Sequence, residues 1–148
     1  MNDAKQLYTL LWMSRPLMQA TEAVVESGLE GTGLTVRTRA VLEILLANGA
    51  ATVPELANKL EIKRQYVQLM VNETLAEGLT SKQPNPRHKR STMIALTEKG
   101  RALVEAAVGR EMALVSSIGA EVDPGDVEAA LKVVTSLIEK LKSEIGDT

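Results

Sequence analysis

The chain lacks several residue types on which common kinds of protein chemistry depend. Its 148 residues include no cysteine, no phenylalanine and a single histidine. Without cysteine there is no disulfide, no thiolate nucleophile, no cysteine-ligated zinc and no cysteine-based peroxide sensing. The lone His88 has no second histidine or cysteine with which to hold a metal, so we expect neither a metal site nor a cofactor.

Long apolar runs are also missing. None approaches the ~18 residues that a membrane helix needs. Residues 1–6 lack the basic start, apolar centre and small-residue cleavage site of a secretory signal. We therefore expect a cytoplasmic protein, and the length fits one compact domain with its own core.

Scarce aromatics and an uneven charge bear on the kind of partner. With one Trp and two Tyr, the chain cannot supply the stacking platforms typical of single-strand or RNA binding, so duplex recognition is favoured. The net charge of −2 argues against non-specific coating of nucleic acid. Residues 82–90, however, hold four Lys/Arg and no acid, whereas residues 121–148 hold seven acids and three lysines. This asymmetry says more about partners than the total does.

No catalytic constellation is apparent. Glu43, Glu55 and Glu73 fall on different predicted helices, and nothing pairs them with a base or nucleophile. Serines such as Ser91 have no histidine partner other than His88, and no phosphate-cradling glycine motif occurs. We predict that the protein is not an enzyme and has no catalytic residues.

Apolar periodicity and capping residues predict a mainly helical chain. The first helix is interrupted at Pro16, where it either restarts or kinks. Thr35, Thr52 and Thr97 are the expected N-caps of three later helices, with Thr52 and Glu55 forming a capping box. The predicted helices cover residues 3–29, 35–48, 52–60, 64–75, 97–118 and 123–145, and the predicted strands cover 79–83 and 91–97.

Residues 52–97 carry the main functional signal. Only about three residues separate the third and fourth helices, a spacing typical of a helix-turn-helix. At ~100° per residue the fourth helix has an inward apolar face, made by Val67, Met70, Val71, Thr74 and Leu75. Its other face carries Gln65, Gln68, Leu69 and Asn72, with Tyr66 at the margin.

Amide side chains can pair bidentately with adenine edges. Taken alone, the outward face of the fourth helix could equally be a solvated surface, with Leu69 either exposed or touching a thymine methyl. The basic stretch that follows favours DNA contact. We assign Arg64 to phosphate, Lys82 and Lys89 to the DNA backbone, and Arg87 or Arg90 to a narrow minor groove.

Apolar stripes on the terminal segments predict self-association. The first helix and the last two helices are too apolar along one edge to stand alone in water, so we expect a two-fold dimer built from them. Tyr8 and Trp12, one turn apart, either line an effector pocket or pack in the core or interface. We expect the methionines to fill gaps in the core, namely Met13, Met18, Met70, Met93 and Met112.

The sequence resembles the MarR-type winged helix-turn-helix regulators along nearly its whole length. That family tends to show Asp-Pro-x-Asp-Arg-Arg-(Ala/Ser), then, four residues later, an apolar residue followed by x-Leu-Thr-x-x-Gly. This chain has Asn85-Pro86-Arg87-His88-Lys89-Arg90-Ser91, with Leu96-Thr97 and Gly100 in register. Asn85 and His88 replace the two acids. In that family the second acid often braces the arginine two positions on, which is Arg90 in this chain. A neutral His88 can accept one hydrogen bond from Arg90, whereas a charged His88 would repel it.

The resemblance implies a fold, a division of labour and a function. The expected fold is mainly α, with a small β-hairpin wing and long dimerisation helices at both ends. Residues 1–33 and 101–148 would dimerise, and residues 34–100 would bind DNA. The implied function is a homodimeric, sequence-specific regulator, expected to be a repressor, that binds double-stranded pseudo-palindromic DNA and is released by a small aromatic or anionic effector. The alternative is a winged-helix interaction adaptor that does not bind DNA.

Overall fold

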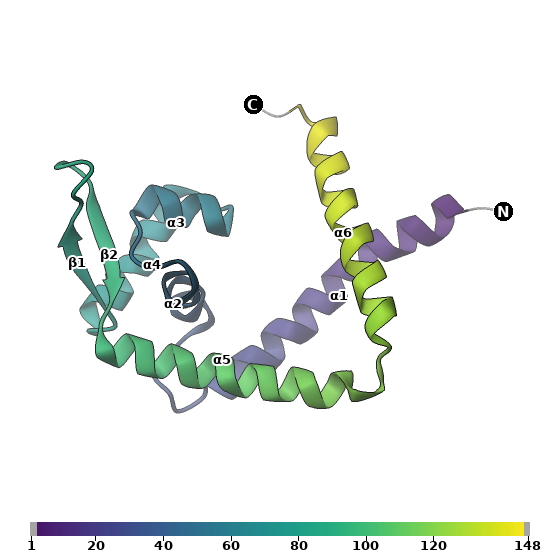
Figure 1. The fold of residues 1–148 in the computed structure, drawn as a ribbon, viewed down its shortest axis with the longest axis horizontal. Coiled ribbons are helices and arrows are strands. Elements are labelled where there is room, and N and C mark those ends of the chain that lie inside the picture. Colours follow the sequence, from purple (N-terminus) through teal and green to yellow (C-terminus); the bar gives the residue numbers. More distant parts are fainter. Residues whose placement is uncertain (1–2, 147–148) are drawn as a thin grey trace. The chain divides into compact units, whose positions relative to one another are not determined.

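The computed structural model describes residues 3–146. Its elements are α1 (Asp3–Leu29), α2 (Val36–Asn48), α3 (Val53–Leu60), α4 (Arg64–Ala76), β1 (Thr80–Pro84), β2 (Thr92–Leu96), α5 (Glu98–Ile118), the 3-10 turn η1 (Gly119–Glu121) and α6 (Pro124–Glu144) (Figure 1). The fold is mainly helical with one antiparallel hairpin, so the predicted fold class is confirmed. None of the helices in the described range is long and apolar enough to cross a membrane.

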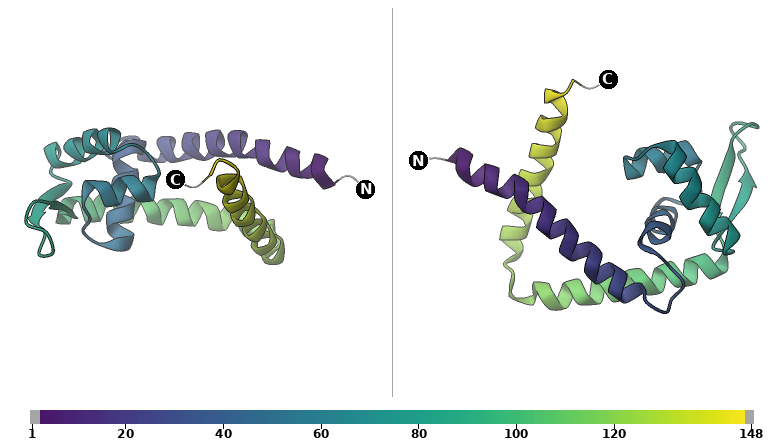
Figure 2. Two further views of the ribbon diagram at one scale, coloured as in Figure 1. Left: turned by 90° about the horizontal axis from the view of Figure 1, so that it is seen from above. Right: turned by 180° about the vertical axis from the view of Figure 1, so that it is seen from behind.

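The chain divides into two compact units, residues 1–111 and 112–148, and the boundary falls inside α5. Within the first unit, the hairpin and helices α2 to α4 lie together at the end of α1 that is farther from the N-terminus (Figure 2). The functional division into residues 1–33, 34–100 and 101–148 stays a prediction.

Side-chain caps explain where the helices begin. Thr35 accepts a hydrogen bond from the backbone N–H of Thr38, whose hydroxyl accepts in turn from the N–H of Thr35. Thr52 and Glu55 make the same reciprocal arrangement at α3. Each cap satisfies donors that the first turn leaves free. The N-caps expected at Thr35 and Thr52 are confirmed.

Two apolar clusters form the core of residues 3–111. The first joins α2, α3, α4 and β2, and its buried members are Val41, Leu45, Ala51, Leu56, Ala57, Val67, Met70, Val71 and Ile94. The second joins the end of α1 to α2, the residue before β1, and α5, and its buried members are Leu29, Leu34, Leu42, Leu79, Val104 and Ala107. The half-buried Leu96 packs against both. The hairpin and α4 are thus held by the same core.

Two expectations about the terminal helices need correction. The first is the restart at Pro16, because α1 runs as one helix from Asp3 to Leu29 with Pro16 inside it; the alternative, a kink at Pro16, stays a prediction. The second is the packing of Met13, Met18 and Met112 in the core, because these side chains are 55%, 57% and 61% exposed. Helical periodicity assigns them to apolar stripes, and those stripes are exposed in the described part of the chain.

Candidate nucleic-acid interface

Helix α4 is fixed by its buried face. Val67 and Val71 are completely buried, as is Thr74, and Met70 is nearly so. The three-residue turn before α4 includes Glu61 in the left-handed region, at φ 55°, which turns the chain sharply between α3 and α4. Because every inward position is occupied, α4 cannot rotate about its axis without exposing apolar surface.

The opposite side of α4 presents a polar surface, which we call the reading face. Its members, all exposed, are Gln65, Tyr66, Gln68, Leu69 and Asn72. The Gln68 Nε2 donates to the Asn72 Oδ1 at 2.9 Å, one helical turn away. The predicted partition of α4 into an inward and an outward face is confirmed. That these side chains contact DNA stays a prediction.

The N-terminus of α4 is open. Lys63 occupies the N-cap without a side-chain hydrogen bond to the first turn, and Arg64 is exposed. Free backbone N–H groups and the positive end of the helix dipole favour an anion at such a position. This geometry suits the phosphate contact predicted for Arg64.

The wing consists of β1, β2 and the loop between them. The strands pair from Thr80 with Leu96 at the root to Pro84 with Thr92 at the far end. In the loop, the Asn85 side-chain oxygen accepts from the N–H of Arg87 at 3.0 Å, and the Asn85 carbonyl accepts from the N–H of His88 at 3.2 Å. Asn85 therefore supplies the local turn that an aspartate at this position would also make.

The wing keeps its positive charge available. The side chains of Lys82, Arg87, Lys89 and Arg90 are all exposed. Within residues 3–146, none of the observed ion pairs includes a wing residue. Exposed cations outside such ion pairs are suited to phosphates.

The carboxylate of Glu55 on α3 is affected by its own helix cap and by the charge of Arg87 in the wing loop. The pKa of Glu55 is lowered mainly because the N–H of Thr52 donates to its carboxylate, then by the Thr52 hydroxyl, with a smaller effect from the charge of Arg87.

The sequence left open whether His88 braces Arg90, and the structure gives His88 another neighbour. Its Nδ1 lies 3.4 Å from the Ser91 hydroxyl, and no hydrogen bond between His88 and Arg90 is present in the described part of the chain. The imidazole is exposed and joins the turn instead.

Thr97 joins the root of the wing to α5. Its hydroxyl donates to the Gly78 carbonyl at 2.7 Å and accepts from the N–H of Gly100 at 3.0 Å, and its own N–H donates to the Leu79 carbonyl at 3.1 Å. A Cβ on Gly100 would lie 2.0 Å from the Leu79 carbonyl oxygen. This contact explains physically why glycine follows Leu96-Thr97 at this spacing.

A partly buried arginine ties α2 to α5: Arg39 Nε donates to Glu111 Oε2 at 2.6 Å, its Nη2 pairs with Glu111 Oε1, and Glu43 lies 2.8 Å from the same Nη2. The hydrogen bond to Glu111 is the main reason that the pKa of Arg39 is raised. The sequence could not reveal a pair 72 positions apart.

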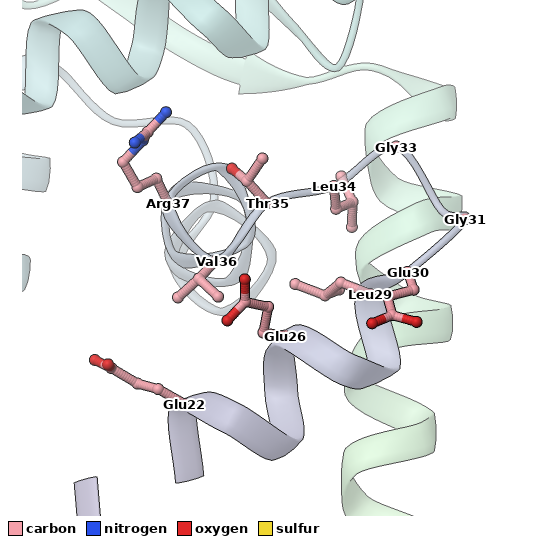
Figure 3. Close-up of a pocket in the computed structure, with 10 residues that line it drawn as sticks. All are labelled: Glu22, Glu26, Leu29, Glu30, Gly31, Gly33, Leu34, Thr35, Val36 and Arg37. Atoms are coloured by element: carbon pink, nitrogen blue, oxygen red, sulfur yellow. The ribbon is translucent and has the colours of Figure 1, made fainter. Parts of the chain in front are cut away.

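An open hollow of about 750 Å³ lies where α1 meets α2 (Figure 3). Three carboxylates line it, those of Glu22, Glu26 and Glu30, whereas Arg37, its only basic lining residue, pairs with Glu73 of α4 at 3.1 Å. This charge disfavours an anionic ligand. The signal in the sequence is the i, i+4, i+8 spacing of the three glutamates, which puts them on one side of a helix.

The predicted effector residues lie elsewhere on α1. Tyr8 and Trp12 are 65% and 55% exposed, with ring centroids 6.3 Å apart, and the Arg15 guanidinium lies 5.9 Å from the Trp12 ring. Neither ring lines the hollow of Figure 3. Among the described residues, no cluster of three or more His, Asp or Glu is arranged to hold a metal.

Apolar side chains remain exposed on the terminal helices. On α1 they are Leu7, Leu10, Leu17, Met18 and Val24, between 40% and 68% exposed. Along α6 and its C-cap they are Val127, Leu131, Val134, Ile138, Leu141 and Ile145, between 43% and 84% exposed. Exposed apolar stripes of this extent are uncommon on a monomer.

Comparison with known proteins places these features in a family. The MarR family model matches residues 32–91. A crystallised MarR family transcription regulator is 32% identical, with 99% of this chain and 97% of that chain aligned at a TM-score of 0.88. The transcriptional repressor MdtR of Bacillus subtilis is 26% identical over 117 residues, which are 78% of this chain and 76% of MdtR.

The crystal structure of CouR from Rhodococcus jostii, bound to p-coumaroyl-CoA, has the same fold. It is 22% identical, with 94% of this chain and 93% of that chain aligned at a TM-score of 0.72. The capped helix-turn-helix, the basic hairpin and the full-length match to a regulator agree with one another: the chain belongs to the MarR family of DNA-binding transcription regulators.

Proposed function

We propose that the protein is a dimeric, sequence-specific repressor that binds double-stranded DNA through α4 and the wing. The observation that carries this proposal is the exposed amide surface of α4 beside a wing whose four cations are exposed and take part in none of the ion pairs observed in residues 3–146. Gln65, Tyr66, Gln68 and Asn72 would meet base edges in the major groove. Arg64 and the wing cations would bind phosphates and the adjacent minor groove.

A two-fold dimer would double this arrangement. The exposed apolar stripes of α1 and α6 support self-association, because burial of their side chains removes apolar surface from water. The two α4 helices should then address half-sites about one helical turn (~34 Å) apart in a pseudo-palindromic operator. Repression is supported by the name of MdtR. We place the protein with its DNA in the cytoplasm.

Selection of bound fragments from the source genome tests the DNA-binding proposal. We expect a short, pseudo-palindromic duplex to be enriched, with binding that weakens steeply as salt rises. Binding of no duplex, or equal binding of all duplexes at every salt concentration, would contradict the proposal and favour the adaptor alternative.

Sedimentation tests the dimer: Leu131→Glu charges a side chain that is 63% exposed in one chain, so the altered protein should sediment as a monomer. The neighbouring Lys132→Gln is its matched control.

We further propose that a small aromatic anion releases the protein from DNA by binding at Tyr8 and Trp12. The two rings and the Arg15 guanidinium offer stacking surface and a cation together, whereas the acidic hollow at α1 and α2 does not suit an anion. CouR, bound to p-coumaroyl-CoA, is a precedent for a ligand on this fold.

Trp12 provides its own assay, because it is the only tryptophan in the chain. Titration with phenolic acids should change its fluorescence, and the same concentrations should release the selected duplex. Arg15→Gln should weaken both effects together, while Arg101→Gln on α5 should leave both unchanged. A fluorescence change without DNA release would contradict the regulatory role.

A further inference from the structure

The hydrogen bond between Gln68 and Asn72 changes what the reading face offers to a base pair. The two residues lie one turn apart on α4, and Gln68 Nε2 donates to Asn72 Oδ1 at 2.9 Å although both side chains are exposed. Because Val67 and Val71 are fully buried on the other side, the amide pair is held outward as a unit.

The bond leaves the pair with complementary groups at its outer edge. Gln68 retains its carbonyl oxygen as an acceptor, and Asn72 retains its amide N–H groups as donors. If both amides are turned over, the pair still keeps one free acceptor and one free donor. The composition of its edge therefore does not depend on how the amides are assigned.

The four bases differ in how well they match this edge. In the major groove adenine presents the N7 acceptor beside the N6 donor, whereas guanine presents two acceptors. A donor and an acceptor side by side complement adenine. The Gln68 amide donates only one of its two N–H groups to Asn72. A bidentate contact from Gln68 alone would leave Asn72 outside the contact, whereas a composite contact uses the pair as the bond holds it.

We infer that Gln68 and Asn72 together form one composite contact to a single adenine, in which one amide accepts from N6 and the other donates to N7. This inference rests on the DNA-binding function proposed above and specifies the base pair and the coupling of the two residues. Leu69, 60% exposed between them in the chain, is placed to meet a neighbouring thymine methyl.

A structural role for the same bond makes a different prediction. Amide pairs at i, i+4 stabilise helices slightly. If that were the whole role of the bond, loss of either residue would lower the melting temperature and leave base preference intact. Base discrimination is therefore the readout that separates the two roles.

A double-mutant cycle on the selected operator tests the inference. The proteins are the unaltered chain, Gln68→Ala, Asn72→Ala and the double variant, each titrated against the operator and against operators with single base-pair replacements. We expect each single variant to lose discrimination of roughly 5- to 150-fold at the same A·T pair. We expect the double variant to lose no more than either single variant, because one contact is lost only once.

Gln65→Ala provides the matched control on the same helix. Gln65 lies seven residues, or two turns, from Asn72, so the losses of Gln65→Ala and Asn72→Ala should multiply. Thermal unfolding of each variant separates a folding defect from a binding defect, since all three side chains are exposed.

Each outcome decides something. Loss at two different base pairs, multiplicative losses for Gln68 and Asn72, or unchanged discrimination in both single variants would overturn the composite contact while leaving the DNA-binding function standing. If the unaltered protein binds none of the selected duplexes, the proposed function falls, and this inference falls with it.

Discussion

The charge of the wing gives a quantitative prediction for the salt dependence of DNA binding. Four exposed cations lie on each wing, namely Lys82, Arg87, Lys89 and Arg90, so the proposed dimer carries eight. Each phosphate that is neutralised contributes about −0.9 to the slope of log K against log salt, so the wings contribute about −7. Replacement of all four residues by glutamine should remove most of that slope.

A single substitution gives a smaller, equally defined effect. Arg90→Gln removes two cations from the dimer, so the slope should become less steep by about 1.8, and affinity should fall roughly 10- to 100-fold at 0.1 M salt. Binding measured by fluorescence anisotropy from 50 to 300 mM salt yields both quantities. Lys132→Gln on α6 is the control, since that side chain is 77% exposed and lies outside the wing.

The slope also reports how many wings engage the duplex. A change near 0.9 for Arg90→Gln would mean that only one wing of a dimer contacts the backbone. A quadruple glutamine variant that keeps the slope of the unaltered protein would refute the assignment of the wing to DNA.

Three further predictions concern stability. Gly100→Ala should lower the free energy of unfolding, measured in urea, by roughly 1–3 kcal/mol or more, because the added Cβ would lie 2.0 Å from the Leu79 carbonyl oxygen. An unchanged unfolding midpoint would contradict the close contact. The hydroxyls of Thr74 and Thr80 lie 2.8 Å apart and are buried. Thr74→Val alone should therefore lower the free energy of unfolding by about 1–3 kcal/mol, and the variant with valine at both positions should lower it less. Additive losses would argue against pairing of the two hydroxyls. The pKa of Glu55 is lowered in the folded chain. The folding stability that Glu55 contributes is therefore complete above the unfolded pKa of ~4.3 and is lost as pH falls through the folded pKa. Stability of Glu55→Gln should therefore decline less between pH 5 and 3 than that of the unaltered chain, and equal declines would contradict this.

Local sequence signals predicted much of the fold. Helix starts at Thr35 and Thr52 were readable because each cap acts within three residues of chain. The inward face of α4 was readable because helical periodicity alone separates Val67 from Gln68. The wing strands followed from the prolines and turn residues between them.

What the sequence did not reveal depends on contacts between distant residues. The pairing of Arg39 with Glu111 and the contact of Gly100 with Leu79 require the folded chain. Met13 was placed in a core because periodicity cannot distinguish burial within a chain from burial between chains. The bond between Gln68 and Asn72 is different, since amides at i and i+4 are neighbours on a helix and the sequence alone can indicate it.

The hydrogen bonds of Thr97 have a consequence for how the protein could acquire new target sites. They secure the base of the hairpin to the start of α5 at 2.7 to 3.1 Å, while the hydrogen bonds observed within residues 85–91 at its far end join neighbours in that loop. Substitutions in that distal loop can alter its charge and contour without disturbing the core. Evolution, or a protein engineer, can therefore exchange the loop as a module and retain the scaffold that presents it.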